Sequence, residues 1–241
     1  MIITIIGCLG AYPLPNGATS GYLIEEGNTQ VLLECGSGVL SKLQQQLPLS
    51  KLDGVVISHY HPDHCADLGC LQYAVMIETQ LSLRTKSFCA WGPGEVERVT
   101  YYEYCKGYSY EFVPSFEIGT LRFQTCKNLH EINGYAIKVT DSHGKTLVFS
   151  GDTGYYEGLA AFAANADCFL CESSFYAGQT GHGKQHLNAE QAGRLTLEAQ
   201  AKLLVLTHLP HFGDTDQLVV QAGTLFKGEV QLARQWQRII L

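Results

Sequence analysis

The sequence predicts an α/β fold, and three observations support that prediction. Short runs of apolar and β-branched residues alternate along the chain with longer segments of helical character. The hydrophobic content is 46% and the charged content 16%, a balance that favours a globular chain over a disordered one. Histidine and carboxylate side chains directly follow several of the predicted strands, which is where layered α/β proteins collect their functional sites.

The individual elements follow from local patterns. Strands are expected where short apolar runs are bounded by glycine, proline or asparagine, and helices where longer stretches lie between turn signals. The predicted strands are residues 1–7, 21–25, 29–35, 55–57, 87–91, 112–116, 121–126, 134–140, 146–150, 168–171, 203–207 and 229–232. The predicted helices are residues 39–46, 67–79, 95–104, 157–165, 188–199 and 216–226.

Turn and capping signals place the ends of several elements. A hairpin closes near residues 27–28, which read Gly-Asn. Residues 92–94, Gly-Pro-Gly, turn the chain into the predicted helix at 95–104. Asn188 with a glutamine three residues later gives a capped start to the helix that ends at residue 199. A short turn at residues 142–145 joins two strands, and we expect His143 to face solvent there.

Length and composition limit the class of protein. A chain of 241 residues fits one domain, residues 1–241. No apolar stretch approaches the length of a membrane span, and residues 1–7 resemble a first strand more than a signal peptide. Nine irregularly placed cysteines without an export signal predict reduced thiols and a cytoplasmic location. A net charge of −7 argues against a surface made for long nucleic acids.

The densest chemical signal follows an early apolar strand. Residues 58–64 read Ser-His-Tyr-His-Pro-Asp-His, although nine histidines in this chain would place only about 0.2 in a window of six. His59 and His61 project to one side of an extended chain, and the proline favours a turn that carries Asp63 and His64 toward a neighbouring position. The pattern predicts two adjacent metal ions; the alternative is a solvated, histidine-rich loop.

The pattern of residues 59–64 resembles the H-x-H-x-D-H signature of the metallo-β-lactamase superfamily. The segments that resemble the opening of its ribonuclease Z-like branch are Gly7-Cys8, Thr19-Ser20-Gly21-Tyr22-Leu23 and Leu32-Leu33-Glu34-Cys35-Gly36. This resemblance implies a four-layer αββα sandwich with a metal site of one or two ions at one edge of the two sheets.

The resemblance also implies a set of metal ligands. In the family, a lone histidine, a Gly-Asp-Thr stretch and a Leu-Thr-His stretch follow the first motif, and this chain has them at His130, residues 151–153 and residues 206–208. Taken singly, each of these has an ordinary reading as a loop, turn or strand-end residue. The implied first metal site is His59, His61 and His130, the second is Asp63, His64 and His208, and Asp152 bridges them. Zinc suits such ligands best, while manganese, iron or cobalt are alternatives.

A catalytic assignment follows from the same resemblance. A hydroxide bridging the two ions would be the nucleophile, and Asp63 would orient or deprotonate the water. His186 is the predicted general acid, with Glu172 as its partner. The stretch Cys-Glu-Ser-Ser-Phe around Glu172 resembles the His-Glu-Ala-Thr-Phe of the branch, whereas His-Leu-Asn stands where the branch usually has His-Ser-Thr. Alternatively, the two residues are a structural pair that closes the wall of the site.

Three further residues and one loop have an expected role in the site, and each also has an alternative interpretation. Glu34 stands where the branch usually has aspartate and is expected to accept a hydrogen bond from the histidine loop, unless it is a strand-end carboxylate in water. His182 and His211 are candidates for substrate contact, unless they are simple loop histidines. The glycine-containing loop 177–185 is expected to be mobile, and its closure over substrate is left open.

Together these features predict a dinuclear metal-dependent hydrolase, specifically a phosphodiesterase acting on a small or short substrate. The alternatives are a hydrolase of carboxylic esters, lactones or thioesters, and a non-catalytic metal-binding or interaction module. Transfer RNA is not an expected partner, because the turn at 142–145 stands where family enzymes that process it commonly hold a long gripping arm. No membrane partner is expected, and relatives in the family are often dimers, which makes a homodimer the expected assembly.

Overall fold

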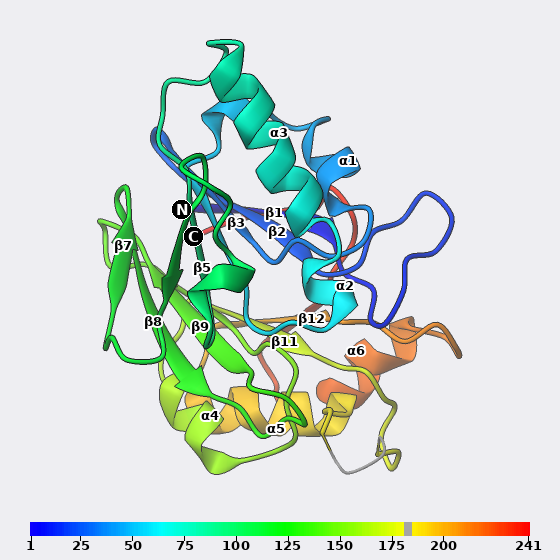
Figure 1. The fold of residues 1–241 in the computed structure, drawn as a ribbon. Helices are drawn as coiled ribbons and strands as arrows, with labels where there is room; N and C mark the ends of the chain where they lie inside the picture. The colour runs from blue at the N-terminus through cyan, green and yellow to red at the C-terminus, as the bar shows by residue number, and fades with distance from the viewer. Residues whose placement is uncertain (181–184) are drawn as a thin grey trace.

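The computed structural model describes residues 1–180 and 185–241 and is built on two sheets (Figure 1). The strands of the first sheet, in spatial order, are β14 (Arg238–Ile240), β1 (Ile2–Gly7), β2 (Gly21–Glu26), β3 (Thr29–Leu33), β4 (Gly54–Val56), β5 (Cys89–Gly92) and β6 (Lys106–Ser109). Those of the second are β13 (Glu229–Leu232), β12 (Leu203–Thr207), β11 (Cys168–Glu172), β10 (Thr146–Phe149), β9 (Tyr135–Thr140), β8 (Leu121–Lys127) and β7 (Phe116–Ile118).

Six α-helices accompany the two sheets in the described part of the chain. They are α1 (Val39–Leu43), α2 (Pro62–Cys65), α3 (Leu68–Gln80), α4 (Glu157–Phe162), α5 (Ala189–Ala199) and α6 (Asp216–Ala222), with single 3₁₀ turns η1 (Leu49–Lys51) and η2 (Val96–Arg98). Figure 1 shows α1 and α3 above the first sheet and α4, α5 and α6 below the second. The four-layer αββα sandwich implied by the family resemblance is therefore confirmed. None of the described helices combines the length and apolar character needed to cross a bilayer.

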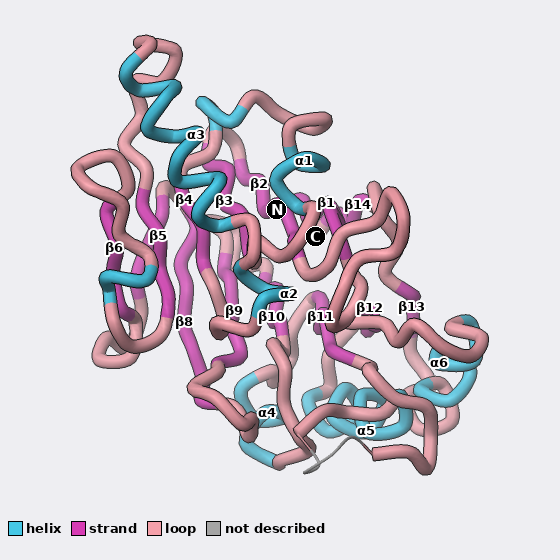
Figure 2. The backbone as a smooth tube through the Cα atoms, turned by 45° about the vertical axis from the view of Figure 1, so that its right-hand side comes forward, coloured by secondary structure: helices cyan, strands magenta, loops and turns pink. Residues whose placement is uncertain are grey.

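Both sheets share one layout, and it determines where a site can form. In each, an antiparallel half continues into a parallel half, β3 to β6 in the first sheet and β10 to β13 in the second. Ligands of such sheets bind outside the carboxyl ends of the parallel strands. Figure 2 shows α2, which directly follows β4, beside the second sheet near β10 and β11. The loops that leave β4, β10, β11 and β12 can therefore meet.

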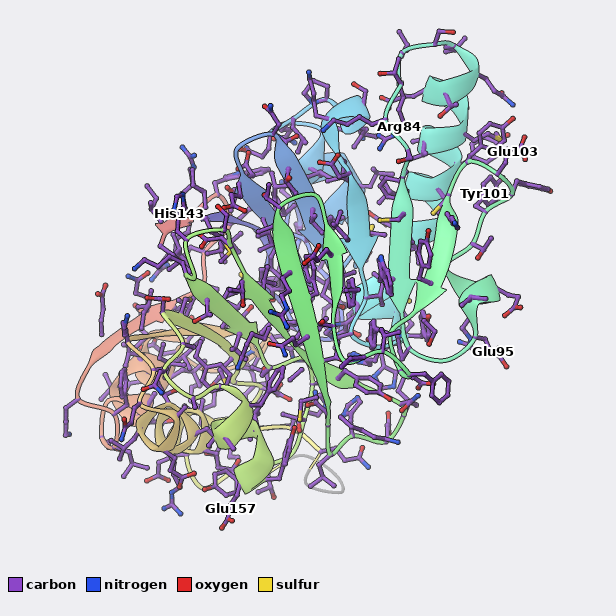
Figure 3. All side chains as sticks on the ribbon, turned by 90° about the vertical axis from the view of Figure 1, so that its left-hand side faces the viewer. Arg84, Glu95, Tyr101, Glu103, His143 and Glu157 are labelled. Atoms are coloured by element: carbon purple, nitrogen blue, oxygen red, sulfur yellow. The ribbon has the colours of Figure 1, made fainter. Side chains whose placement is uncertain are left out.

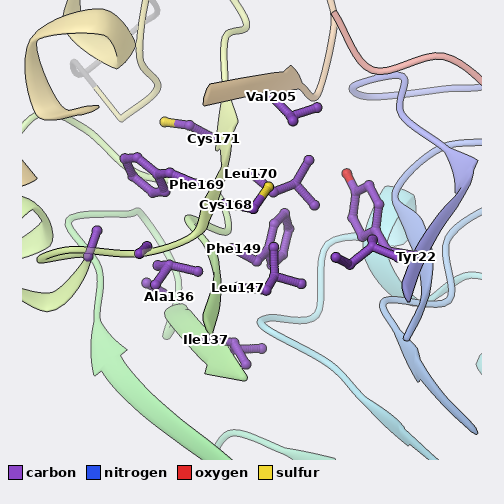
Figure 4. Close-up of a cluster of buried hydrophobic side chains, with 14 of the residues drawn as sticks. Tyr22, Ala136, Ile137, Leu147, Phe149, Cys168, Phe169, Leu170, Cys171 and Val205 are labelled. Atoms are coloured by element: carbon purple, nitrogen blue, oxygen red, sulfur yellow. The ribbon is translucent and has the colours of Figure 1, made fainter. Parts of the chain in front are cut away.

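Inner strands such as β2, β3 and β11 are largely apolar on both faces, because both faces are covered. In β2, Tyr22 and Ile24 pack between the sheets, while Leu23 packs under α1 and α3. The Tyr22 ring lies 5.2 Å from that of Phe149 in the opposite sheet (Figure 4). The Tyr22 hydroxyl forms a 2.7 Å hydrogen bond with the hydroxyl of Thr207, at the end of β12. This contact ties the two sheets together directly beside the candidate site.

The structure corrects the sequence prediction between residues 95 and 118, and it adds the edge strand β14, which was not predicted. The helix predicted at 95–104 is wrong: only η2 is helical, and β6, which was not predicted, follows it. The tyrosine-rich, β-branched segment that follows η2 is poorly suited to a helix, and its continuation pairs with β5 instead. The strand predicted at 112–116 lies later, at β7, because Pro114 cannot donate a sheet hydrogen bond and Phe112 is 90% exposed.

A short turn joins β9 to β10, with Thr140 paired to Thr146. His143 is exposed at its end, as expected from the sequence, and Figure 3 shows it at the periphery of the molecule. The Asp141 carboxylate closes the turn by accepting hydrogen bonds from the backbone of His143 and Lys145. No extended arm emerges from this connection.

Candidate metal centre

The first group of candidate ligands converges through three imidazole rings. His59 Nε2 lies 3.1 Å from His61 Nδ1, which lies 3.2 Å from His130 Nε2. His59 and His61 come from the loop after β4, and His130 comes from the loop between β8 and β9. Their nitrogens form a four-member cluster with a carboxylate oxygen of Asp152. The structure thus brings together residues that are up to 93 positions apart in the chain.

The second group is more deeply buried and contains two carboxylates. His208 Nε2 lies 3.0 Å from Asp63 Oδ2 and 3.3 Å from Asp152 Oδ2. His64 Nε2 lies 3.3 Å from the other oxygen of Asp152. Asp152 Oδ2 also lies 3.6 Å from His59 Nε2 of the first group. A single carboxylate therefore stands between the two groups and is the one residue they share.

Hydrogen bonds on the far side of each ring determine which nitrogen faces the centre. The Nδ1 atom of His64 donates to Glu34 Oε2 at 2.8 Å, and that of His130 donates to the carbonyl of Gln185 at 3.3 Å. His61 is held by its other nitrogen, Nε2, which lies 3.0 Å from a carboxylate oxygen of Glu131. Anchoring one ring nitrogen as a donor leaves the opposite nitrogen with a lone pair aimed inward.

A serine hydroxyl holds the outward-facing nitrogen of His208 in the same way. The Ser174 hydroxyl donates to Glu172 Oε2 at 2.6 Å, so its oxygen accepts from His208 Nδ1 at 2.8 Å. On the other side of the centre, the Ser58 hydroxyl lies 3.0 Å from His59 Nδ1. All five candidate imidazole ligands thus carry a partner on the nitrogen that faces away from the centre, which is the usual arrangement around protein-bound metals.

The residues fit a bound cation. His64 Nε2 and Asp152 Oδ1 are completely buried and lack a hydrogen-bond partner, although buried polar atoms are normally satisfied. Burial, and then the neighbouring His64, hold the pKa of His59 well below its usual range. Burial favours the neutral form of Asp152, but His208 and His64 hold its pKa well below its usual range. A neutral imidazole and an ionised carboxylate are the forms that bind metal.

The backbone at the site is strained in two places. Glu34 and His208 have φ values of 64° and 52°, in the left-handed region that residues other than glycine rarely adopt. Gly10 passes so close to His208 that an added Cβ would lie 2.8 Å from its ring. Left-handed residues of this kind cluster at functional sites, where the surrounding contacts offset a cost of about 1–3 kcal/mol.

His186 lies beside the second group and pairs with a buried glutamate. Its Nδ1 atom is 3.2 and 3.1 Å from the two carboxylate oxygens of Glu172, and its ring stacks on His208 at 5.4 Å. Burial opposes protonation of His186, but the charge and hydrogen bonds of Glu172 dominate and raise its pKa to about 9. Because Nδ1 is held by Glu172, Nε2 is the nitrogen free to give or take a proton.

Two cavities border the centre, one beside each group of candidate ligands. One, of about 450 Å³, lies beside His61 and is lined by residues that include Tyr60, Arg98 and Asn133. The other, of about 340 Å³, lies beside His186 and His208. His211 lines this second cavity, as its assignment as a substrate contact requires, whereas His182 lies outside the described residues. The loop 177–185 is also only partly described, so its expected mobility stays a prediction.

Several groups that support the ligands were not predicted from the sequence. Ser58 and Ser174 stand next to recognised motif residues, yet no spacing rule marks them as partners of His59 and His208. Glu131 directly follows His130, which is a signal that could have been followed. The backbone N–H of Ala11 donates to Asp63 Oδ2 at 2.8 Å, and no side-chain pattern could have shown that.

Replacing Glu34 by glutamine tests the hydrogen bond behind His64. Glu34 Oε1 accepts a hydrogen bond from the backbone N–H of Ser58, and Oε2 accepts one from His64. The glutamine side chain would therefore point its NH₂ group, a donor, at one of these two N–H groups. We expect the metal affinity to fall about 10- to 100-fold, measured by chelator competition. The exposed Glu157→Gln variant is the matched control. Unchanged affinity in Glu34→Gln would remove Glu34 from the site.

The architecture and the clustered histidines and aspartates define a class of protein. A family model described as Beta-lactamase superfamily domain matches residues 29–209. The chain therefore belongs to the metallo-β-lactamase superfamily, which confirms the resemblance found in the sequence.

The chain is also similar to individual proteins of this superfamily. The chain is 41% identical over 239 residues to "Probable metallo-hydrolase YhfI" of Bacillus subtilis, covering 97% of each chain. The crystal structure of the metallo-beta-lactamase fold protein YhfI from that organism matches with a TM-score of 0.93 at 38% identity, over 99% of this chain and 98% of that one. Human tRNase Z, short form, shares the fold, with a TM-score of 0.78 at 21% identity over 100% of this chain and 99% of that one.

Proposed function

We propose that this protein is a metal-dependent hydrolase that binds two divalent ions, with zinc as the first candidate, and cleaves a phosphodiester in a small or short substrate. The observation that carries the proposal is the Asp152 carboxylate shared between two groups of inward-facing imidazoles. The name of the Bacillus subtilis relative, a metallo-hydrolase, agrees with the class of reaction. The substrate class rests on the residues around the centre.

The proposed ligands divide as the two groups do. His59, His61 and His130 would hold one ion, Asp63, His64 and His208 would hold the other, and Asp152 would contact both. Two such ions supply Lewis acidity, which activates water near neutral pH and counters charge on the substrate oxygens. The Ala11 N–H holds Asp63 Oδ2, which lies 3.0 Å from His208 Nε2, so the Asp63 carboxylate is fixed at the centre and would both bind the ion and orient or deprotonate the attacking water.

The pair of His186 and Glu172 favours a phosphodiester over an ester. An alkoxide leaving from phosphorus needs a proton as the bond breaks, and a positioned imidazolium can donate it. Glu172 holds Nδ1 of His186 and keeps the ring oriented, so the proton would be donated from Nε2. A reaction that needs less help at the leaving group, such as thioester hydrolysis, would not require this pair. The short connection between β9 and β10 supports a substrate other than transfer RNA.

The experiment is a joint measurement of metal content and turnover on one sample. Protein purified without added metal is analysed for elements and then assayed with bis(p-nitrophenyl) phosphate, with and without chelator. We expect about two transition-metal equivalents per chain and hydrolysis that chelator abolishes. Two equivalents without turnover would overturn the phosphodiesterase and favour a carboxylic ester, lactone or thioester hydrolase, or a non-catalytic module. No binding after reconstitution would overturn the ligand set.

A further inference from the structure

The two cavities beside the centre differ in chemistry. The cavity beside His61 contains charged side chains, because Arg98 and Glu95 line it. Among the described residues, the cavity beside His186 is lined by no lysine, arginine or carboxylate, and most of its exposed lining is apolar or aromatic. Three aromatic rings supply that character, those of Tyr12, Phe175 and Phe212. The second cavity is therefore suited to a flat, uncharged group.

The aromatic lining is held in place and is open to a ligand. The Tyr12 ring stacks on the His211 ring at 3.8 Å with 10° between the planes. His211 is fixed in turn, because its Nε2 atom donates to the carbonyl of Gly10 at 2.8 Å. Tyr12 and Phe212 nevertheless remain 57% and 50% exposed. Large aromatic surfaces that are both anchored and exposed favour the stacking of a second ring.

The position of His186 gives the two cavities different roles. A general acid must lie within hydrogen-bonding reach of the leaving oxygen. His186 lines the aromatic cavity and does not line the cavity beside His61. In the proposed reaction, water gives a proton to Asp63 as its oxygen bonds to phosphorus, and the bond from phosphorus to the leaving oxygen breaks with its electron pair on that oxygen. The proton of His186 then neutralises the leaving oxygen, so the departing group lies on the His186 side.

We propose that the cavity beside His186 binds the leaving group of the substrate and selects a flat aromatic one. The retained part of the substrate faces the cavity beside His61. This inference rests on the proposed function and deepens it. Tyr12 and Phe212 are its specificity-determining residues.

Binding of simple phosphonates to the metal-loaded protein tests the position of the ring. We expect phenylphosphonate to bind about five- to tenfold more tightly than cyclohexylphosphonate by titration calorimetry, because only the former can stack. Tyr12→Leu should abolish this preference and leave methylphosphonate binding unchanged, whereas Tyr12→Phe should keep it. Tyr102→Leu, at an exposed tyrosine outside this cavity, is the control. The proposal is overturned if the preference for the phenyl group survives in Tyr12→Leu and Phe212→Leu. It is also overturned if the preference disappears in Ile132→Ala, a variant of the cavity beside His61.

Kinetics with methyl p-nitrophenyl phosphate test the role of the ring as leaving group. The nitrophenyl ring is the only ring of this substrate, and it departs. We expect Tyr12→Leu to raise KM about five- to tenfold with kcat little changed. An unchanged KM would overturn the leaving-group assignment. If the metal-loaded protein cleaves no phosphodiester, the proposed function is overturned. If it cleaves phosphodiesters but has no preference for an aromatic leaving group, only the assignment of this cavity is overturned.

Discussion

Replacing Asp152 by asparagine or alanine is expected to reduce hydrolysis at least about a thousandfold, equivalent to ~4 kcal/mol of transition-state stabilisation. Both oxygens of this carboxylate face inward, one toward His64 and the other toward His59 and His208. Its removal leaves both groups of imidazoles without their shared negative charge. The metal content should fall from about two equivalents to one or fewer, measured by elemental analysis of the purified variant.

A matched control separates this effect from a general loss of acidic charge. Asp216 is exposed and pairs with Arg234 on the surface, so Asp216→Asn should keep both metal content and turnover. Exposed ion pairs of this kind contribute little to stability. Circular dichroism should show that Asp152→Asn is folded. Full activity in a folded Asp152→Asn protein would contradict the assignment of this residue as the shared ligand.

Replacing His186 by glutamine is expected to lower kcat by about 100- to 1,000-fold for a substrate with an alkyl leaving group, such as a dinucleotide. The two metal equivalents should remain, because His186 lies beside the second group and belongs to neither four-residue cluster that shares Asp152. The proton donor and the metal ligands would then be distinguished in a single variant.

The leaving group provides the decisive comparison for His186. p-Nitrophenolate departs readily without a proton, so bis(p-nitrophenyl) phosphate should lose no more than about tenfold in the same variant. His143→Gln, at the exposed end of the β9–β10 turn, is the matched control and should behave as the unmodified protein does. Equal losses with both substrates would show that His186 does not protonate the leaving group. Loss of metal would show a structural role instead.

The parts of the site that could be predicted are those that a short segment contains by itself. Residues 59–64 lie within one turn after one strand, so their clustering is visible in the sequence. His130, Asp152 and His208 were assigned through the family resemblance, because nothing local distinguishes them from ordinary loop residues. They lie close to residues 59–64 because the two sheets pack against each other.

The supporting groups could not be predicted for the same reason. Ser174 links His208 to Glu172 only because β11 and β12 are neighbours in one sheet, and sequence spacing does not show that pairing. Among the elements, the buried strands were found most reliably, since both faces of β2 and β3 are apolar. The short edge strands β6 and β14 were missed, because β6 (Lys-Gly-Tyr-Ser) carries no apolar run and the apolar run within β14 is only two residues long.

The candidate ligands come from both halves of the molecule, and this has a consequence for folding. His64 lies in α2, which follows β4 of the first sheet, and His208 follows β12 of the second, 144 residues later in the chain. An ion that joins them would cross-link distant segments much as a disulfide closes a long loop. We expect such an ion to be fully held only after both sheets have docked, because neither half alone presents the full set of donors. The metal content of a purified sample would therefore report what fraction of the protein has its two sheets correctly docked.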